Sequence, residues 1–165
     1  MPIQIQIFEK EDADEIVSLI HRSMFETNIA DYSEEDLMED AKKFTTDTII
    51  ERASWTNFYV FKDSDKIIAT GAIGPYWDST VESSFFTIFV LPEYQGKGVG
   101  ALIIKTLEND EFYKRAERIE IPASITAVPF YQKYGYSFKN GIDSPDDEGI
   151  VRMEKHKNRM IESGN

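Results

Sequence analysis

Cysteine is absent from this chain of 165 residues. Without a thiol the protein forms no disulfide, binds no metal through thiolates and has no cysteine nucleophile. Basic residues are also few, because 18 lysines and arginines stand against 30 aspartates and glutamates, for a formal net charge of −12. Nucleic-acid backbones are bound through basic surfaces, so this balance argues against nucleic acid as a partner.

Long hydrophobic runs are missing as well. No uninterrupted apolar stretch approaches the roughly 18 residues that a membrane-spanning helix needs, and the N-terminus, MPIQIQIFEKED, lacks the basic start and apolar centre of a signal peptide. We therefore expect a cytoplasmic protein with no membrane association. The hydrophobic content of 41% supports a packed core, and we expect residues 1–165 to form a single domain.

The most informative segment runs from Phe86 to Leu107, FTIFVLPEYQGKGVGALIIKTL. Its apolar, β-branched start predicts a central strand that ends at Pro92. Three glycines within five residues, Gly96, Gly98 and Gly100, predict a turn, and apolar residues at helical spacing follow it. A bare turn seldom needs so many glycines. Because the first amides of a helix have no intrahelical partner and lie at the positive end of its dipole, the segment predicts a phosphate-binding site.

Two common nucleotide-binding motifs fit this segment poorly. A P-loop has Ser or Thr directly after its lysine, whereas Lys97 is followed by Gly98. A dinucleotide-binding fingerprint has GxGxxG in the first strand–helix unit, whereas here the third glycine comes one residue too early and the motif lies past the middle of the chain.

The pattern V-x-P-E-Y-Q-G-K-G-V-G resembles the Q/R-x-x-G-x-G/A pyrophosphate loop of the GNAT superfamily of N-acetyltransferases. A second segment, RIEIPASITAVPFYQKYGYSF from Arg118, resembles the A-x-x-F-Y-x-K-x-G-F pattern of the same family. It matches at Ala127, Phe130, Tyr131, Lys133, Gly135 and Tyr136. Thr126 stands where the family often has Asn, and Tyr136 stands where it often has Phe.

The resemblance implies coenzyme A, delivered as acetyl-CoA, as the cofactor. In the family the loop amides hold the pyrophosphate, and pantetheine lies between two parallel strands that splay apart, here Phe86 to Val90 and Arg118 to Pro122. Backbone groups exposed by such a splay can pair with the pantetheine amides as a missing strand would. The residues expected to bind cofactor are Ile88, Phe89, Val90, Gln95, Gly96, Lys97, Gly98, Val99, Gly100, Thr126, Phe130 and Lys133. Coenzyme A is an anion, and the protein has a net negative charge. Positive charge near the ligand is expected from Lys97, Lys105 and Lys133.

The resemblance also assigns Tyr131 as the catalytic acid, because a phenol is protonated at neutral pH and can protonate a departing thiolate. The alternative for Tyr131 is a core aromatic. A backbone N–H near Val90 would polarise the thioester carbonyl. Glu82 is the nearest carboxylate that could act as a base. The alternative for Glu82 is an ordinary solvated residue at the end of a strand. With no cysteine, the acetyl group passes directly to the acceptor or uses another nucleophile.

Hydrophobic periodicity predicts the remaining elements. Their order is a strand, two helices, three strands, a helix, a strand, a helix and two strands. The expected bounds are a strand over Gln4–Phe8, a helix from Asp12, a helical region from Ser33, a hairpin of Phe58–Phe61 with Ile67–Ile73, a short strand over Ile119–Pro122, a helix over about Thr126–Tyr134, a strand from Tyr136, and an exposed loop over Asn140–Glu148. Gly71 and Gly74 suggest a bulge or a close approach of a ligand backbone.

We therefore expect an α+β fold, a three-layer α/β/α arrangement around a mixed, largely antiparallel sheet of about seven strands, with a V-shaped splay between strands 4 and 5. The leading functional hypothesis is acetyl transfer to the amino group of a small molecule or peptide, by a monomer or homodimer. The alternative is a non-catalytic acyl-CoA-binding sensor or protein-interaction module. No metal is expected, because the acidic loop lacks EF-hand spacing and neither histidine, His21 or His156, has a partner at ligand spacing. Acceptor choice is expected to depend on Met24–Arg52 and on Tyr76, Trp77 and Asp78.

Overall fold

The structure is a computed structural model, and it describes residues 2–157. The chain divides into two compact units. Unit 1 comprises Met1–Ala72 with Thr87–Glu108, and unit 2 comprises Ile73–Phe86 with Asn109–Asn165. The third and fourth strands, β3 (Lys66–Pro75) and β4 (Glu82–Val90), each run from one unit into the other.

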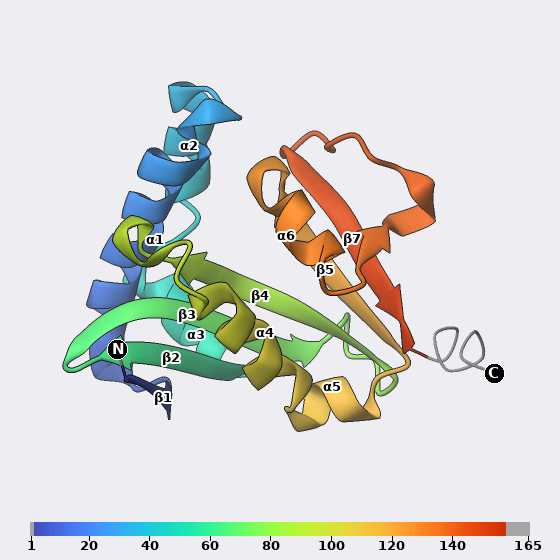
Figure 1. Cartoon of the computed structure of the whole chain (residues 1–165), viewed down its shortest axis with the longest axis horizontal. Coiled ribbons are helices and arrows are strands. Elements are labelled where there is room, and N and C mark those ends of the chain that lie inside the picture. Colours follow the sequence, from blue (N-terminus) through green and yellow to red (C-terminus); the bar gives the residue numbers. More distant parts are fainter. Residues whose placement is uncertain (1, 158–165) are drawn as a thin grey trace. The chain divides into compact units, whose positions relative to one another are not determined.

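Seven strands form one sheet in the order β1-β2-β3-β4-β5-β7-β6 (Figure 1). The other bounds are β1 Ile3–Ile7, β2 Asn57–Asp63, β5 Arg118–Ser124, β6 Ser137–Phe138 and β7 Ile150–His156. β1 and β2, β5 and β7, and β6 and β7 are antiparallel, whereas β4 and β5 are parallel. The predicted mixed, largely antiparallel sheet is confirmed.

The parallel ladder between β4 and β5 is short. It pairs Glu82 with Arg118, Ser83 with Ile119 and Ser84 with Glu120. β4 continues to Val90 beyond these pairs, as the predicted splay between strands 4 and 5 requires.

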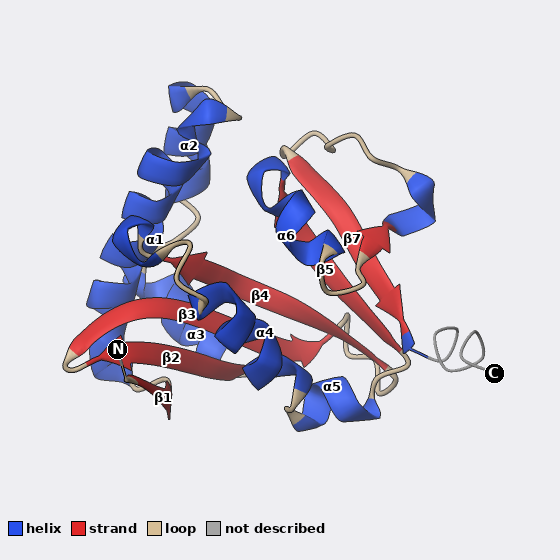
Figure 2. Ribbon diagram, in the orientation of Figure 1, coloured by secondary structure: helices blue, strands red, loops and turns tan. Residues whose placement is uncertain are grey.

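Helices cover both faces of the sheet, and Figure 2 shows α4 on the near face and α3 on the far face of the strands of unit 1. The α-helices are α1 Ala13–Thr27, α2 Glu34–Ala41, α3 Thr46–Ala53, α4 Val99–Glu108, α5 Glu111–Arg115 and α6 Val128–Gln132. Short 3₁₀ turns lie at Lys10–Asp12, Asn28–Ala30, Pro92–Tyr94, Ile125–Ala127 and Lys139–Gly141. None of the helices within residues 2–157 has the length and apolar character needed to cross a membrane.

Unit 1 is built on the predicted hairpin of β2 and β3. The two strands turn at Ser64, which has a φ of +56°, and the apolar residues of the hairpin are fully buried. α4 packs directly on β3, because a Cβ added at Gly71 would lie 2.7 Å from Cγ2 of Ile103. The close approach that Gly71 predicts is therefore made by a helix and not by a ligand backbone.

Unit 2 has its own core. β5 and β7 pair along their whole length, from Arg118 opposite His156 to Ser124 opposite Ile150, and they bury Ile119, Ile121, Val151 and Met153. The loop that precedes β7 is exposed from Asn140 to Glu148, as predicted.

Several predicted bounds were wrong. Three helices and not two precede the hairpin, because Thr45 and Thr48 form a reciprocal capping box that starts α3. α5 was also missed, and it is a helix of only five residues, Glu111–Arg115, capped by the side chain of Asp110. Ser33 caps α2 by accepting a hydrogen bond from the Asp36 amide.

Differences in the later part of the chain are smaller. β4 begins at Glu82 and not at Phe86, because its first residues pair with β5. The helix predicted over Thr126–Tyr134 is a 3₁₀ turn followed by the short α6. It ends before Gly135, whose φ of +90° supplies the predicted left-handed residue.

Candidate functional site

The glycine-rich turn forms the N-terminal end of α4. Gly96 and Gly98 have φ values of +74° and +83°, which L-residues with a Cβ rarely adopt. A Cβ built at either position meets no atom within 4 Å, so the space beside the turn is open. The Leu102 amide donates to the Gly98 carbonyl at 3.2 Å and closes the first helical turn. The amides before Leu102 have no intrahelical acceptor. The backbone N–H groups of Gly98, Val99 and Gly100 are therefore suited to bind an anion.

The residues that precede the turn hold it against the rest of unit 1. Gln95 Nε2 donates to Thr27 Oγ1 at 2.8 Å and to the Val90 carbonyl at 3.2 Å. The Tyr94 hydroxyl donates to Asp63 at 2.7 Å. Exposed Lys97 places its ammonium 5.5 Å from the centre of the Tyr94 ring. Gln95 thus has a structural role that the sequence did not indicate, and Lys97 adds a positive charge beside the open turn.

The end of β4 has an unusual backbone. Ile88, Phe89 and Val90 are half-buried, and Thr87 just before them has a φ of +53°. A β-branched residue in this conformation is strained. Thr70, which is fully buried, donates its hydroxyl to the Thr87 carbonyl at 2.8 Å. This bond holds the Thr87 backbone in place, three residues beyond the last pair of the ladder with β5.

Tyr131 lies on α6 in unit 2 and is 5% exposed. Its ring contacts those of Phe130 and Tyr136 edge-on, with centroids 5.2 and 6.3 Å away. Burial raises the pKa of the Tyr131 phenol well above its usual value, because the charged phenolate is poorly solvated there. The phenol therefore keeps its proton throughout the neutral and moderately alkaline range, and Tyr131 is also part of the core.

The other sequence-predicted positions of unit 2 lie around α6. Thr126 is within the 3₁₀ turn that leads into the helix, Phe130 is half-buried beside Tyr131, and Lys133 is exposed directly after the helix. The Phe130 ring also packs against Tyr134 at 5.2 Å.

Glu82 is held by an arginine. The guanidinium of Arg118 donates to Glu82 at 3.2 Å and to Glu120 and Glu154 at 2.9 Å each. Lys139 forms an ion pair with Glu120 at 3.0 Å. Burial by itself lowers the pKa of Arg118, but the bonds to Glu82 and Glu120 raise it above its usual value. Glu82 is therefore paired with a permanent cation and is not free to approach a substrate amine without breaking this pair.

The structure thus assembles the predicted positions in two groups. Unit 1 brings together Ile88–Val90 and Gln95–Gly100, and unit 2 brings together Thr126, Phe130, Tyr131 and Lys133. Sequence analysis missed Thr70, Thr87 and the Arg118 network. Thr87 carries no sequence signal, since threonine is common in strands. The hint available in the sequence was Glu120, which lies two residues after Arg118 and therefore on the same face of the strand.

The two histidines have ordinary roles. His21 Nε2 donates to the carbonyls of Ala41 and Phe44 at 2.9 and 3.0 Å, so it fixes the chain where α2 ends. His156 Nε2 lies 3.3 Å from Glu154. Within residues 2–157 no three His, Asp or Glu side chains are grouped so as to hold a metal ion.

Comparisons with known proteins agree with this geometry. The family model described as "Acetyltransferase (GNAT) domain" matches residues 28–157. An uncharacterized N-acetyltransferase of Escherichia coli, YafP, is 25% identical over 134 residues, which cover 81% of each chain.

Solved structures share the fold. The PaiA N-acetyltransferase of Thermoplasma acidophilum, in complex with coenzyme A, superimposes with a TM-score of 0.80 at 18% identity, over 94% of this chain and 99% of the other. The ribosomal-protein-S18-alanine N-acetyltransferase of E. coli superimposes with a TM-score of 0.66 at 17% identity, over 94% of each chain. At these identities the likeness bears on the fold alone.

Proposed function

Since the chain belongs to the GNAT acetyltransferase family, we propose that it transfers the acetyl group of acetyl-CoA directly to the amino group of a small molecule or peptide. The observation that carries this proposal is the glycine turn at the start of α4. Gly96 and Gly98 adopt conformations that favour glycine, and the space beside both is open. Such a turn lets a pyrophosphate approach the helix amides closely.

The residues at the end of β4 supply backbone groups for the pantetheine part of the cofactor. Pantetheine carries amide groups, and the backbone of Ile88, Phe89 and Val90 continues beyond the ladder with β5. Backbone N–H and C=O groups outside a ladder can pair with such amides. We assign these residues to pantetheine, the Gln95–Gly100 turn with Lys97 to pyrophosphate, and Thr126, Phe130 and Lys133 to further contacts with the cofactor.

Acetyl-CoA supplies an activated thioester carbonyl when it binds. The chain must then polarise that carbonyl and provide a proton for the departing sulfur. A backbone N–H near Val90 serves the first role. Tyr131 serves the second, because a phenol is protonated at neutral pH and can donate a proton to a departing thiolate. Glu82 is engaged by Arg118, so water or solvent removes the proton of the amine.

A panel of amines tests the proposal. Release of free thiol from acetyl-CoA is measured in the presence of small amines and of peptides with free N-termini, and the product is identified by a mass increase of one acetyl group. Acetylation of at least one amine, faster than without protein, is the expected result. Tight binding of acetyl-CoA without turnover on any acceptor would instead favour the non-catalytic acyl-CoA sensor.

A further inference from the structure

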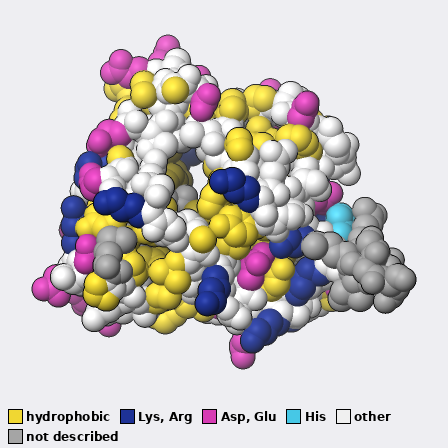
Figure 3. Space-filling view, viewed as in Figure 1, with side chains coloured by type: hydrophobic (Ala, Val, Ile, Leu, Met, Phe, Trp, Pro, Cys, Tyr) yellow, Lys and Arg dark blue, Asp and Glu magenta, His cyan; other side chains and the backbone are white. Residues whose placement is uncertain are grey.

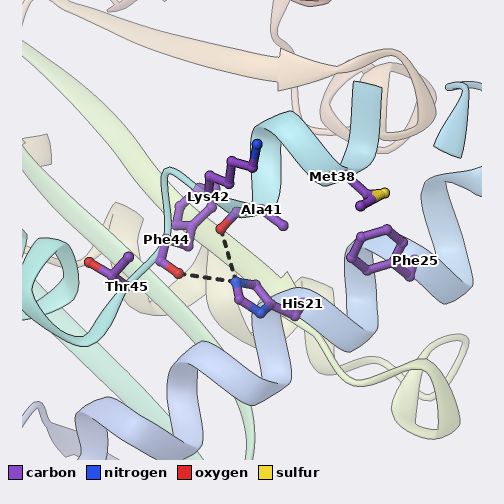
Figure 4. A pocket seen from close by; sticks show the side chains of 7 residues that line it. All are labelled: His21, Phe25, Met38, Ala41, Lys42, Phe44 and Thr45. Carbon is purple, nitrogen blue, oxygen red and sulfur yellow. Dashed lines mark hydrogen bonds between the residues drawn. The ribbon is translucent and has the colours of Figure 1, made fainter. Parts of the chain in front are cut away.

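A hollow of about 330 Å³ opens in unit 1 beside α1 and α2. Its walls are provided by His21, Phe25, Met38, Ala41, Lys42, Phe44 and Thr45. Figure 4 shows the side chains of Phe25 and Met38 near each other at the right of the view, and His21 to their left, toward Ala41 and Phe44. Its volume is at the lower end of the range for small-molecule sites.

The polar atoms of the wall are largely engaged already. The His21 Nε2–H is shared between the Ala41 and Phe44 carbonyls (Figure 4). Lys42 forms an ion pair with Glu39 at 3.0 Å. The surfaces that remain for a ligand are the rings of Phe25 and Phe44 and the thioether of Met38. The hydrogen bonds of His21 also hold the Phe44 segment in place, so the wall is preformed.

An aromatic contact joins the hollow to β4. The Phe44 ring lies 5.5 Å from that of Phe89, with an interplanar angle of 82°. Phe89 belongs to the strand segment that we assign to pantetheine. A group bound in the hollow is therefore separated from that segment by the thickness of one side chain.

The charge beside the hollow favours a cation. The stretch from Glu34 to Lys43 has five carboxylates and two lysines. Figure 3 shows acidic side chains at the end of the molecule where Figure 1 labels α2. An ammonium ion is attracted to such a surface, and an anion is repelled.

We propose that this hollow receives an apolar substituent of the acyl acceptor, so that the acceptor is an amine with an aromatic or branched aliphatic group next to its amino group. The inference rests on the proposed function and narrows its acceptor class. An apolar site of this kind makes polyamines and hydroxylated amines poor acceptors, because they would leave the rings of Phe25 and Phe44 without an apolar partner.

Matched acceptors test the class. Phenethylamine is compared with ethanolamine, and a short peptide with N-terminal Phe is compared with the same peptide with N-terminal Ser. The kcat/KM for the apolar member is expected to be at least about tenfold higher, as fits the burial of one apolar group. The amine pair and the peptide pair show separately whether the substituent comes from a small molecule or from a peptide.

A variant localises the effect. Met38 is 53% exposed, so Met38→Gln leaves the core intact. We expect it to raise KM for the apolar acceptors several-fold and to raise KM for ethanolamine much less. Ile29→Gln is the matched control, because Ile29 is 48% exposed and does not line the hollow. Thermal stabilisation by acetyl-CoA should be the same in both variants.

The outcomes separate this inference from the proposed function. Acetylation of polar and apolar amines at equal rates, or equal effects of Met38→Gln on both, overturns the inference while amine acetylation stands. Absence of thiol release with every amine overturns the proposed function and the inference together.

Discussion

At the scale of single residues, the proposed chemistry depends most on the hydroxyl of Tyr131. Tyr131→Phe keeps the ring and its contacts with Phe130 and Tyr136 but removes the proton donor. General acids contribute about 10² to 10⁴ in rate, so we expect a loss of about 100-fold in the acetylation step with little change in cofactor affinity. Single-turnover rates and calorimetric binding of coenzyme A measure the two quantities.

Tyr134→Phe is the matched control for this variant. It removes a hydroxyl from a neighbouring residue that packs on the same Phe130 ring, and we expect its rate to remain near that of the unaltered protein. If Tyr131→Phe changes the rate less than about threefold, far below the range of general acids, Tyr131 is a packing residue only.

Thr87 allows a test of backbone strain. At most strand positions a variant with Gly is less stable than a variant with Ala by about 0.5–1 kcal/mol. A positive φ reverses this order, because Ala is strained in that conformation. We expect Thr87→Gly to be more stable than Thr87→Ala by about 1 kcal/mol in urea unfolding. Ser137, exposed in β6 and without a positive φ, should show the opposite order. The same order at both positions would mean that Thr87 is unstrained.

At the scale of elements, the start of α4 is the part that we expect to bind phosphate. Gly98→Asp places a carboxylate beside the helix amides, where it competes with and repels pyrophosphate. Coenzyme A affinity should fall by more than about tenfold, because repulsion between two unit charges a few Å apart near a protein surface costs up to about 4 kcal/mol. Isothermal titration calorimetry measures the loss.

Gly141→Asp provides a closely matched control. Gly141 also has a positive φ, +72°, with open space where a Cβ would lie, and it belongs to a loop to which we assign no cofactor contact. The same charge and the same strain are introduced there, so affinity should be unchanged. Equal affinities in both folded variants would place the phosphates elsewhere.

The Arg118 network joins β4, β5 and β7 within unit 2. Arg118→Met leaves Glu82, Glu120 and Glu154 without their shared cation, and removal of one partner from a buried ion pair costs about 3–5 kcal/mol. The three carboxylates then repel one another, and binding of a proton by any of them relieves this repulsion in the folded variant. The loss of stability should therefore be larger at pH 8 than at pH 5.

Urea unfolding at both pH values measures this deficit. Arg152→Met is the control, because its pair with Asp146 is exposed, with side chains 44% and 37% accessible, and exposed pairs contribute at most about 1 kcal/mol. A deficit in Arg118→Met that is independent of pH would show that the arginine contributes packing and not charge compensation.

At the scale of the whole molecule, ligand binding should be visible as stability. A ligand at 100 times its dissociation constant adds about 2.7 kcal/mol to the unfolding free energy, which corresponds to a rise of several degrees in Tm. We expect coenzyme A and acetyl-CoA to give this rise in a thermal scan, and ATP and NAD to give much less. Equal shifts with ATP would show that the turn binds phosphate without selecting coenzyme A.

Organisation as one domain remains a prediction. The chain forms two compact units, yet β3 and β4 each contribute residues to both. The two units therefore share two continuous strands. The predicted extent, 1–165, includes Met1 and residues 158–165, which lie outside the described residues.

The sequence by itself determined the order of most elements, the mixed sheet and the position of the glycine turn. These follow from local properties, since apolar periodicity, the end of a strand at Pro92 and the left-handed glycines Gly96 and Gly98 depend only on nearby residues. The short helices α3 and α5 were missed because their capping residues, Thr45 and Asp110, were not interpreted as helix starts.

Tertiary structure alone decided the features that depend on residues far apart in the chain. The carbonyl of Thr87 is held by a hydrogen bond from Thr70 on another strand, and Glu82 is paired with Arg118, which reaches it from β5. The hollow beside α2 requires Phe25 of α1 and Phe44, which follows α2, to line the same surface. Local sequence carries no information about such partners, since they are selected by the packing of the folded chain.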